Sequence, residues 1–449
     1  MRLTILGGGG FRVPLVHRAL CAPAADRLVD ELVLHDTDPL RLRAISNVLA
    51  ASPSSGTAGP AVRIADSLDD ALRGTDVVFS AVRVGGTAGR VADEKVALAA
   101  GVLGQETTGP GGVAYALRSL PFATALARRI AVLAPSAWVV NFTNPAGMVT
   151  AAMQRELGER VVGICDSPTG LIRRVARACG VDPSGSGVVA DYAGLNHLGW
   201  LRSLTVDGVD RLPALLADDD ALGRFEEGRL FGGELLRLLG SVPNEYLYYY
   251  YSNREAVAAL RAADRTRGES IVEQQARLYP RLAEAGDDAF ALWDAARRER
   301  EEGYLAEARA DGEERDERDL VGGGYEQVAL AVMRALLTDV PAELVLNVRN
   351  GFTLTQLSPD AVVEVPTRVD ATGVHPHHSA PFDEHQLGLV SAVRAVESAT
   401  MEAASKGSRT AALRALTVHP LVDSAAVART LLDGYLAAHE ELRRLLVNP

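Results

Sequence analysis

Four consecutive glycines, Gly7–Gly10, stand between an apolar strand predicted over Arg2–Leu6 and a helix, and no other feature constrains the fold as much. Glycines let the backbone approach a pyrophosphate, and the helix N-terminus supplies N–H donors and the positive end of a dipole. Asp36 ends the next predicted strand, where a carboxylate would accept hydrogen bonds from ribose hydroxyls. The motif favours a dinucleotide site over a tight turn without a ligand, although Arg12 stands where the third glycine is usual. The expected cofactor-binding residues are Gly7, Gly8, Gly9, Gly10, Phe11 and Asp36.

Strand and helix patterns alternate in the first part of the chain, which is typical of a parallel sheet. Strands are predicted at Arg2–Leu6, Glu31–His35, Asp76–Val84, Ala137–Phe142 and Arg160–Ile164. Helical patterns lie between them, as at Arg41–Ala50 and Leu117–Leu133. We therefore predict an α/β fold whose N-terminal domain, residues 1–190, is a Rossmann-like, doubly wound, dinucleotide-binding sheet.

The pattern changes near residue 190, and residues 191–449 are predicted to form a second, mixed α/β domain. Strands are expected at Val188–Leu195, Leu201–Val206, Leu344–Val348 and Ala361–Val365, and helices at Ala214–Leu239, at Glu255–Ala310 and throughout the C-terminal end.

Composition excludes several kinds of partner. The 449 residues include 46 Lys and Arg against 58 Asp and Glu, a net charge of −12, which disfavours binding to nucleic acid or an anionic membrane. An anionic substrate would need a local arginine pocket. Three cysteines are too few and odd in number for a disulfide framework, so we expect a reducing, cytoplasmic setting. No apolar run is long enough to span a bilayer, and the N-terminus does not read as a signal peptide.

Cys165 and His197 are candidate metal ligands. Cys165 ends a predicted strand, at the edge that faces the ligand crevice in open α/β sheets, and His197 lies in a polar pair with Asn196 between apolar flanks. A thiolate and an imidazole suit a divalent transition metal. Spacing alone, however, favours a buried free cysteine and a satisfied core histidine.

Several segments together resemble glycoside hydrolase family 4, the NAD- and metal-dependent group that acts on phosphorylated or plain glycosides, and within it the 6-phospho-β-glucosidases. The resemblance covers nearly the whole chain. Its most specific segments are GQETTGPGG at 104–112 and NFTNPAGMVT at 141–150, and it extends to GICDSP at 163–168, GLNH at 194–197 and PNEYLYYY at 243–250.

The resemblance implies a role for each matching residue. Cys165 and His197 become ligands of manganese or another divalent metal, Tyr246 the catalytic base, and Asp166 a proton donor to the leaving group. The implied substrate-binding residues are Arg90, Asn144, Asn196 and Arg267. A phenol ionises near pH 10, so we expect the metal and an arginine to lower the pKa of Tyr246.

The implied reaction is hydrolysis of a (6-phospho-)β-glucoside through transient oxidation at C3, loss of the C2 proton, elimination of the aglycone and addition of water, in a homo-oligomer (dimer or tetramer). Many β-specific members carry asparagine after the cysteine, whereas Asp166 is typical of α-specific members, so an α-specific glucosidase or a galactosidase of the same family stays open. A malate/lactate-type dehydrogenase and a non-catalytic NAD-sensing module are the alternatives outside the family.

Overall fold

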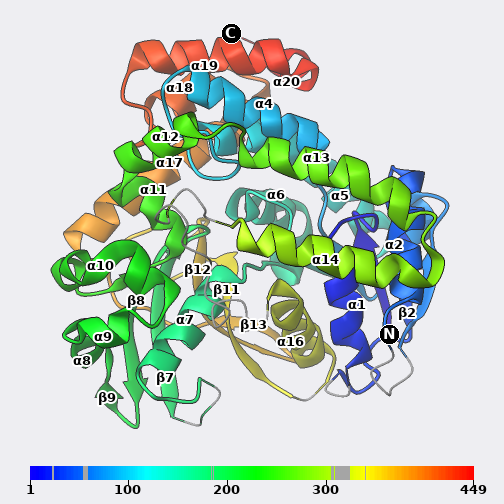
Figure 1. The fold of residues 1–449 in the computed structure, drawn as a ribbon, viewed down its shortest axis with the longest axis horizontal. Helices are drawn as coiled ribbons and strands as arrows, with labels where there is room; N and C mark the ends of the chain where they lie inside the picture. The colour runs from blue at the N-terminus through cyan, green and yellow to red at the C-terminus, as the bar shows by residue number, and fades with distance from the viewer. Residues whose placement is uncertain are drawn as a thin grey trace.

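One sheet runs through the molecule (Figure 1). The structure, a computed structural model, describes residues 1–22, 25–53, 59–183, 185, 187–304, 308, 324–338 and 340–448. The strand order is β10-β8-β7-β12-β11-β6-β5-β4-β1-β2-β3, with β9 paired to β8 and β13 paired to β12.

The N-terminal strands are parallel and take the order 3-2-1-4-5-6. They are β1 (Arg2–Leu6), β2 (Glu31–His35), β3 (Ala61–Ile64), β4 (Val77–Ser80), β5 (Trp138–Asn141) and β6 (Val161–Gly163). Apart from the edge strand β3, they are short and mostly buried, as expected for a sheet covered on both faces. This order is that of dinucleotide-binding sheets, so the predicted Rossmann-like fold class is confirmed.

The remaining strands are antiparallel and extend the same sheet. They are β7 (Val188–Leu195), β8 (Leu198–Val206), β9 (Val209–Asp210), β10 (Val242–Pro243), β11 (Ala342–Arg349), β12 (Val362–Asp370) and β13 (Gly373–Pro376). The hairpin β11–β12 lies between β6 and β7, where Asn347 pairs with Gly163 and Glu364 pairs with Gly194. Strands β6 and β7 are therefore separated by two strands that come much later in the chain.

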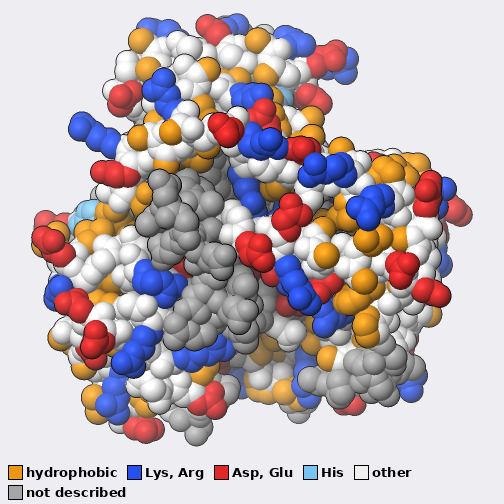
Figure 2. Space-filling model, in the orientation of Figure 1, with side chains coloured by type: hydrophobic (Ala, Val, Ile, Leu, Met, Phe, Trp, Pro, Cys, Tyr) orange, Lys and Arg blue, Asp and Glu red, His pale blue; other side chains and the backbone are white. Residues whose placement is uncertain are grey.

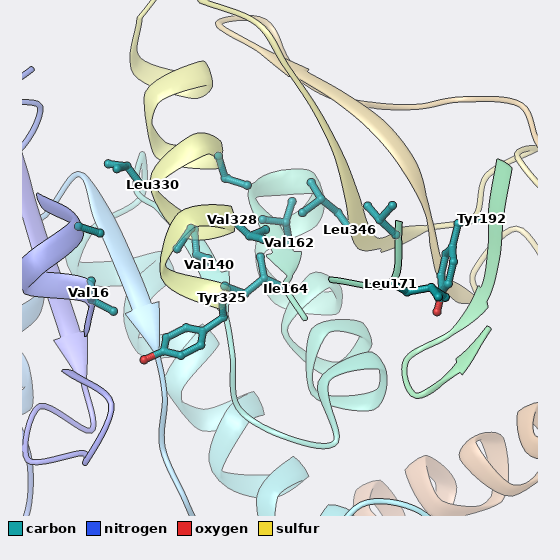
Figure 3. Packing of buried hydrophobic residues seen from close by; sticks show 14 of the residues in the cluster. Val16, Val140, Val162, Ile164, Leu171, Tyr192, Tyr325, Val328, Leu330 and Leu346 are labelled. Carbon is teal, nitrogen blue, oxygen red and sulfur yellow. The ribbon is translucent and has the colours of Figure 1, made fainter. Parts of the chain in front are cut away.

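Helices cover both faces of the parallel strands. The N-terminal set is α1 (Val13–Cys21), α2 (Pro39–Ala50), α3 (Leu68–Leu72), α4 (Gly86–Ala99), α5 (Pro110–Leu133), α6 (Ala146–Leu157) and α7 (Ser167–Ala178). In the packing shown in Figure 3, Val140, Val162 and Ile164 around β5 and β6 lie close to Val328 and Leu346. The core thus joins early and late parts of the sequence.

Further helices come from the C-terminal half. They are α8 (Leu212–Leu216), α9 (Asp219–Leu222), α10 (Glu226–Leu239), α11 (Tyr248–Tyr251), α12 (Asn253–Ala262), α13 (Arg267–Leu282), α14 (Ala289–Glu302), α16 (Tyr325–Leu337), α17 (Glu384–Lys406), α18 (Arg409–Thr417), α19 (Ala425–Ala438) and α20 (Glu440–Leu445). Helices α18 to α20 lie near α4 at one end of the molecule, and α13 and α14 pack against α2 (Figure 1).

Several boundaries differ from the sequence prediction. The helix expected from Leu117 begins at Pro110, and the strand expected over Asp76–Val84 is only Val77–Ser80. The strand expected from Leu201 begins at Leu198, because the chain reverses in a two-residue turn after β7. The helix expected over Ala214–Leu239 is three helices, the last of which is interrupted at Gly232, with φ of +71°. The helix expected over Glu255–Ala310 is divided into α12, α13 and α14, and 305–307 and 309–310 lie outside the described residues.

Acidic and basic side chains are interspersed on the face drawn in Figure 2, without an extended area of either sign. Within the described ranges, no helix has the length and apolar character needed to cross a bilayer.

Candidate active site

The glycine turn joins β1 to α1 in the conformation that the motif predicts. Gly7 has φ of +84°, and a Cβ there would lie 2.5 Å from the Ala81 carbonyl oxygen, so a larger residue is excluded. The Asp36 carboxylate accepts from the Gly9 amide at 3.0 Å and from the Asp38 amide at 3.1 Å. Asp36 therefore lies against the turn and holds its shape, and its contact with a ribose stays a prediction.

The turn retains donors for an anion. In the part of the chain that the structure describes, the amides of Phe11 and Arg12 donate to no acceptor, and both lie at the N-terminus of α1. Free N–H groups at such a position suit a pyrophosphate. The turn therefore fits the phosphates of a dinucleotide.

Cys165 and His197 come from the ends of β6 and β7. Cys165 is a free, buried thiol whose pKa is raised well above its usual value by burial and then by Glu364 and Asp166. His197 is the second residue of the β7–β8 turn and has φ of +63°, a conformation rare for a residue with a Cβ. Such strain persists only where the surroundings impose it, and it is common at functional sites.

The His197 ring is fixed on two sides. Its Nδ1 lies 3.0 Å from Thr107 Oγ1, and its face stacks on Tyr246 with ring centroids 3.8 Å apart and planes 10° apart. Burial lowers the pKa of His197 to about 4, so the ring is neutral at pH 7. The neutral imidazole is the form that binds a metal, and a partner at one nitrogen orients the other.

Tyr246 lies in a short 3₁₀ turn, Glu245–Leu247, that precedes α11. Its hydroxyl is hydrogen-bonded to Tyr304. Burial, followed by the charges of Glu245 and Cys165, raises the pKa of Tyr246 well above 10. The protein alone thus shifts this pKa in the direction opposite to the one expected for a base.

Two buried carboxyl groups near Cys165 were missed by sequence reasoning. Glu245 accepts from Ser167 Oγ at 2.5 Å and from the Tyr304 hydroxyl at 3.3 Å, and burial followed by Glu227 raises its pKa. Glu364 accepts from three donors, and burial raises its pKa to about 7. Those donors are Asn347 at 2.8 Å, Tyr192 at 3.2 Å and Asn196 at 3.3 Å. The sequence did offer a signal for each of these two carboxyl groups. Glu245 directly precedes Tyr246, and Glu364 interrupts the apolar run of β12.

Arginines converge on one side of the site. Arg90 bonds Glu94 at 2.7 Å and Glu106 at 2.9 Å, and Arg83 bonds Glu106 at 2.7 Å. Burial alone would raise the pKa of Glu106, but the positive charges of Arg83 and Arg90 outweigh this effect. The pKa of Glu106 is therefore well below its usual value. Burial and then Arg12, Arg90, Arg267 and Arg83 lower the pKa of Arg300 to about 9, so these guanidinium groups are close together. An anion would relieve their repulsion.

Asp166 and Asn144 follow the ends of parallel strands, whereas Arg267 begins α13. Asp166 follows Cys165 and lies 3.9 Å from Arg12, with both side chains partly exposed. Asn144 follows β5, precedes a cis proline and accepts from the Ala146 amide at 3.3 Å. The Arg267 guanidinium donates to the Arg300 carbonyl at 2.5 Å. The carboxyl ends of the parallel strands meet at one edge of the sheet, which is where open α/β sheets bind ligands.

Cys165 and His197 fit a metal by their chemistry. Among the described residues, no group of three or more His, Cys, Asp and Glu could hold an ion. One sulfur and one nitrogen suit a transition metal, and two protein ligands would leave positions open for substrate oxygens. A cation would also stabilise the thiolate that burial opposes.

Comparison with known proteins gives the family. The family model "Family 4 glycosyl hydrolase" matches residues 2–181, and "Family 4 glycosyl hydrolase C-terminal domain" matches residues 192–422. A 6-phospho-beta-glucosidase of Escherichia coli is 28% identical, over 98% of this chain and 96% of its own.

Solved structures agree. The 6-phospho-beta glucosidase of Thermotoga maritima, with manganese, NAD+ and glucose-6-phosphate, has a TM-score of 0.79 at 26% identity, covering 98% of this chain and 99% of its own. A 6-phospho-alpha-glucosidase from gut microorganisms, in complex with NAD and Mn2+, has a TM-score of 0.77 at 25% identity and covers 97% of each chain. The chain therefore belongs to glycoside hydrolase family 4 and is a glycosidase.

Proposed function

We propose that this chain hydrolyses 6-phospho-β-glucosides with NAD+ and a divalent cation, manganese above all, as cofactors. The observation that carries the proposal is the stacking of Tyr246 on His197, near the thiol of Cys165. This contact joins a potential base to one potential metal ligand, and the second potential ligand, Cys165, follows β6 at the edge of the sheet that also carries the glycine turn.

The cofactors would supply chemistry that the side chains lack: NAD+ a reversible hydride acceptor for C3 of the sugar, and the cation Lewis acidity at the oxygens of C2 and C3. Cys165 Sγ and His197 Nε2 would hold the cation, with Thr107 fixing the histidine ring. Gly7–Gly10, Phe11 and Asp36 would hold the dinucleotide.

Tyr246 would remove the proton from C2, which makes departure of the aglycone from C1 an elimination. Because burial raises the pKa of this phenol, the base form depends on positive charge brought by the cation and by nearby arginines. Asp166, partly exposed, would donate a proton to the leaving oxygen, and water would then add at C1.

The substrate class follows from the arginines and the relatives. Arg90 and Arg267, with Arg83 and Arg300, would surround a 6-phosphate, whereas Asn144 and Asn196 would bind sugar hydroxyls. The names of the relatives, among them the Escherichia coli protein, support a phosphorylated glucoside.

A 6-phospho-α-glucosidase is the second candidate. Asp166 follows the cysteine, as in α-specific members, and the structure from gut microorganisms is named as a 6-phospho-alpha-glucosidase. The choice between glucose and galactose configuration rests on the same experiment.

That experiment is a panel of aryl α- and β-glucosides and galactosides, with and without a 6-phosphate, assayed with NAD+ and Mn2+. We expect turnover of the 6-phospho-β-glucoside without net accumulation of NADH. Turnover confined to the α-anomer would select the second candidate. Stoichiometric NADH formation from a hydroxy acid, without glycoside cleavage, would identify a dehydrogenase instead.

The metal role is tested separately by removing one ligand. Cys165→Ser should weaken Mn2+ binding by on the order of 100-fold, since even indirect partners of a ligand contribute about 10- to 100-fold. Chelation of the wild-type protein should abolish turnover in the same way. Cys179→Ser is the matched control, because that free thiol lies at the end of α7. Full activity in verified metal-free buffer would contradict the proposal.

Three further points belong to the proposal. Residues 1–190 would form the dinucleotide-binding part, and residues 191–449 the substrate, metal and oligomerisation part. The protein would act in the cytoplasm, in line with its free cysteines, and as a homo-oligomer.

A further inference from the structure

Three aromatic side chains from distant helices donate hydrogen bonds to carbonyl groups of the glycine turn. They come from α13, α14 and α16, far along the chain from the turn itself. The bonds are Tyr279 Oη to Gly9 O at 2.9 Å, Trp293 Nε1 to Phe11 O at 2.8 Å and Tyr325 Oη to Arg12 O at 2.7 Å.

Each donor is buried and held by its own neighbours. Tyr279, Trp293 and Tyr325 are 3%, 0% and 1% exposed, so none can be replaced by water without rearrangement. A guanidinium, that of Arg41, lies 4.0 Å from the Tyr279 ring centroid. The Tyr325 ring stacks on Phe142 with centroids 4.2 Å apart. These donors thus form a rigid support behind the turn.

The bonds determine where the amides of the turn point. In a trans peptide the C=O and N–H point in opposite directions, so a donor fixed on one carbonyl aims the amide of the next residue away from that donor. The bond from Trp293 to the Phe11 carbonyl therefore directs the Arg12 amide, which has no acceptor within the described chain.

The two tyrosines fix neighbouring peptides in the same way. The amide opposite the Gly9 carbonyl is that of Gly10, which bonds the Gly7 carbonyl at 2.8 Å. The amide opposite the Arg12 carbonyl is that of Val13, which bonds the Gly10 carbonyl at 3.1 Å. The shape of the turn therefore depends on both of these aromatic donors.

We propose that Tyr279, Trp293 and Tyr325 are positioning residues for the pyrophosphate of NAD+. They turn the carbonyl oxygens of the turn toward the helices. The Trp293 bond leaves the Arg12 N–H for the anion, and the two tyrosines fix the neighbouring peptides that hold the turn in that shape. The inference rests on the proposed use of NAD+, and it assigns part of the dinucleotide site to residues outside the 1–190 segment.

The test uses Tyr279→Phe, Tyr325→Phe and Trp293→Phe, which remove a donor and keep an aromatic ring. The matched control is Tyr251→Phe, because the Tyr251 hydroxyl bonds Trp200 and His385 and lies in α11, away from the turn. Binding of NAD+ and ADP is measured by calorimetry, and binding of adenosine by competition NMR. The thermal midpoint of each protein without nucleotide is measured alongside.

We expect each turn variant to bind NAD+ and ADP on the order of 10-fold more weakly, because the turn loses a bond that fixes one of its peptides. The Gly9 and Phe11 carbonyls lose their aromatic donor, and the Arg12 carbonyl keeps the Leu15 amide, at 3.0 Å. Adenosine has no phosphate, so its affinity should be the same for every variant and for the wild type. The control variant Tyr251→Phe should bind NAD+ as tightly as the wild type does. At saturating NAD+ the KM for the glycoside should not change. If Trp293→Phe lowers the thermal midpoint strongly, the two tyrosine variants decide the outcome.

Unchanged NAD+ and ADP affinities in both tyrosine variants would overturn the inference while leaving the proposed function intact. Equal losses for adenosine and ADP would also overturn it, because a general loss of the pocket would then be the cause. A wild-type protein that binds no NAD+ would contradict the proposed function itself, and the inference with it.

Discussion

Tyr246 lies face to face with His197, so a change confined to its hydroxyl tests the proposed base without disturbing the stack. Tyr246→Phe keeps the ring and should lower the rate by about 10²- to 10⁴-fold, the usual contribution of general base catalysis. Wild-type product formed in D2O should carry deuterium at C2, because a proton removed from carbon exchanges with solvent. Mass spectrometry of the product measures this.

Tyr248→Phe serves as the control, because Tyr248 is buried in α11 beside Tyr249. It should retain its rate and the deuterium label. Product with protium only at C2 would speak against elimination, since a glycosidase that acts through two carboxylates leaves that bond intact.

At the residue scale, the sequence predicts Cys165, His197 and Tyr246 by resemblance, and their roles stay predictions. Their proximity could not be derived from spacing, because it depends on the turn after β7 and on the 3₁₀ turn before α11. The buried carboxyls of Glu245 and Glu364 were missed because burial depends on the packed neighbours and has no local signature.

At the element scale, the start of α5 folds against the loop that supports His197. A Cβ at Gly112 would lie 2.1 Å from the Thr107 carbonyl oxygen. Gly112→Ala should therefore displace Thr107 from His197, destabilise the fold by about 1–3 kcal/mol and weaken Mn2+ binding by about 10- to 100-fold. Urea unfolding and a metal titration measure the two effects.

Gly388→Ala is the matched control. Gly388 is exposed within α17, and a Cβ there would meet nothing within 4 Å. This change should stabilise the helix by about 0.5–1 kcal/mol and leave metal affinity alone. If Gly112→Ala behaved like its control, the loop would not depend on this close approach.

The elements themselves were largely predictable where the pattern is local. The five parallel strands predicted from apolar runs are present as β1, β2, β4, β5 and β6, because each run is short, apolar and buried between the helices of the two faces. The edge strand β3 was missed because its side chains are mostly exposed. The prediction of one helix over Glu255–Ala310 was wrong, because the apolar periodicity continues across the breaks between α12, α13 and α14. The break before α13 is set by the capping box at Thr266.

For the whole molecule, His419 predicts a response of stability to acid. It is buried, its Nδ1 accepts from the Leu421 amide at 3.0 Å, and burial lowers its pKa from 6.5 to about 4. The unfolded chain binds this proton more readily than the folded one. The contribution of His419 to the free energy of unfolding is therefore fully present above pH 6.5. It is lost as the pH falls toward 4, by on the order of 3 kcal/mol in total.

His419→Asn keeps an acceptor and removes the titration. The free energies of unfolding of the two proteins, measured in urea from pH 7.5 to 4.5, should approach each other as the pH falls. A difference in unfolding free energy between the two proteins that stays constant over this range would contradict the prediction, because burial of His419 would then not lower its pKa.

The insertion of β11 and β12 between β6 and β7 has a consequence for synthesis on the ribosome. Cys165 and His197 are made early, but the strands that separate them end only at Asp370, and the donors to the glycine turn arrive at 279, 293 and 325. A nascent chain that has released only its first 190 residues carries the whole glycine motif without the supports that aim it. Both the dinucleotide and the metal would therefore bind only after most of the chain has emerged. A prematurely terminated product would bind neither of them.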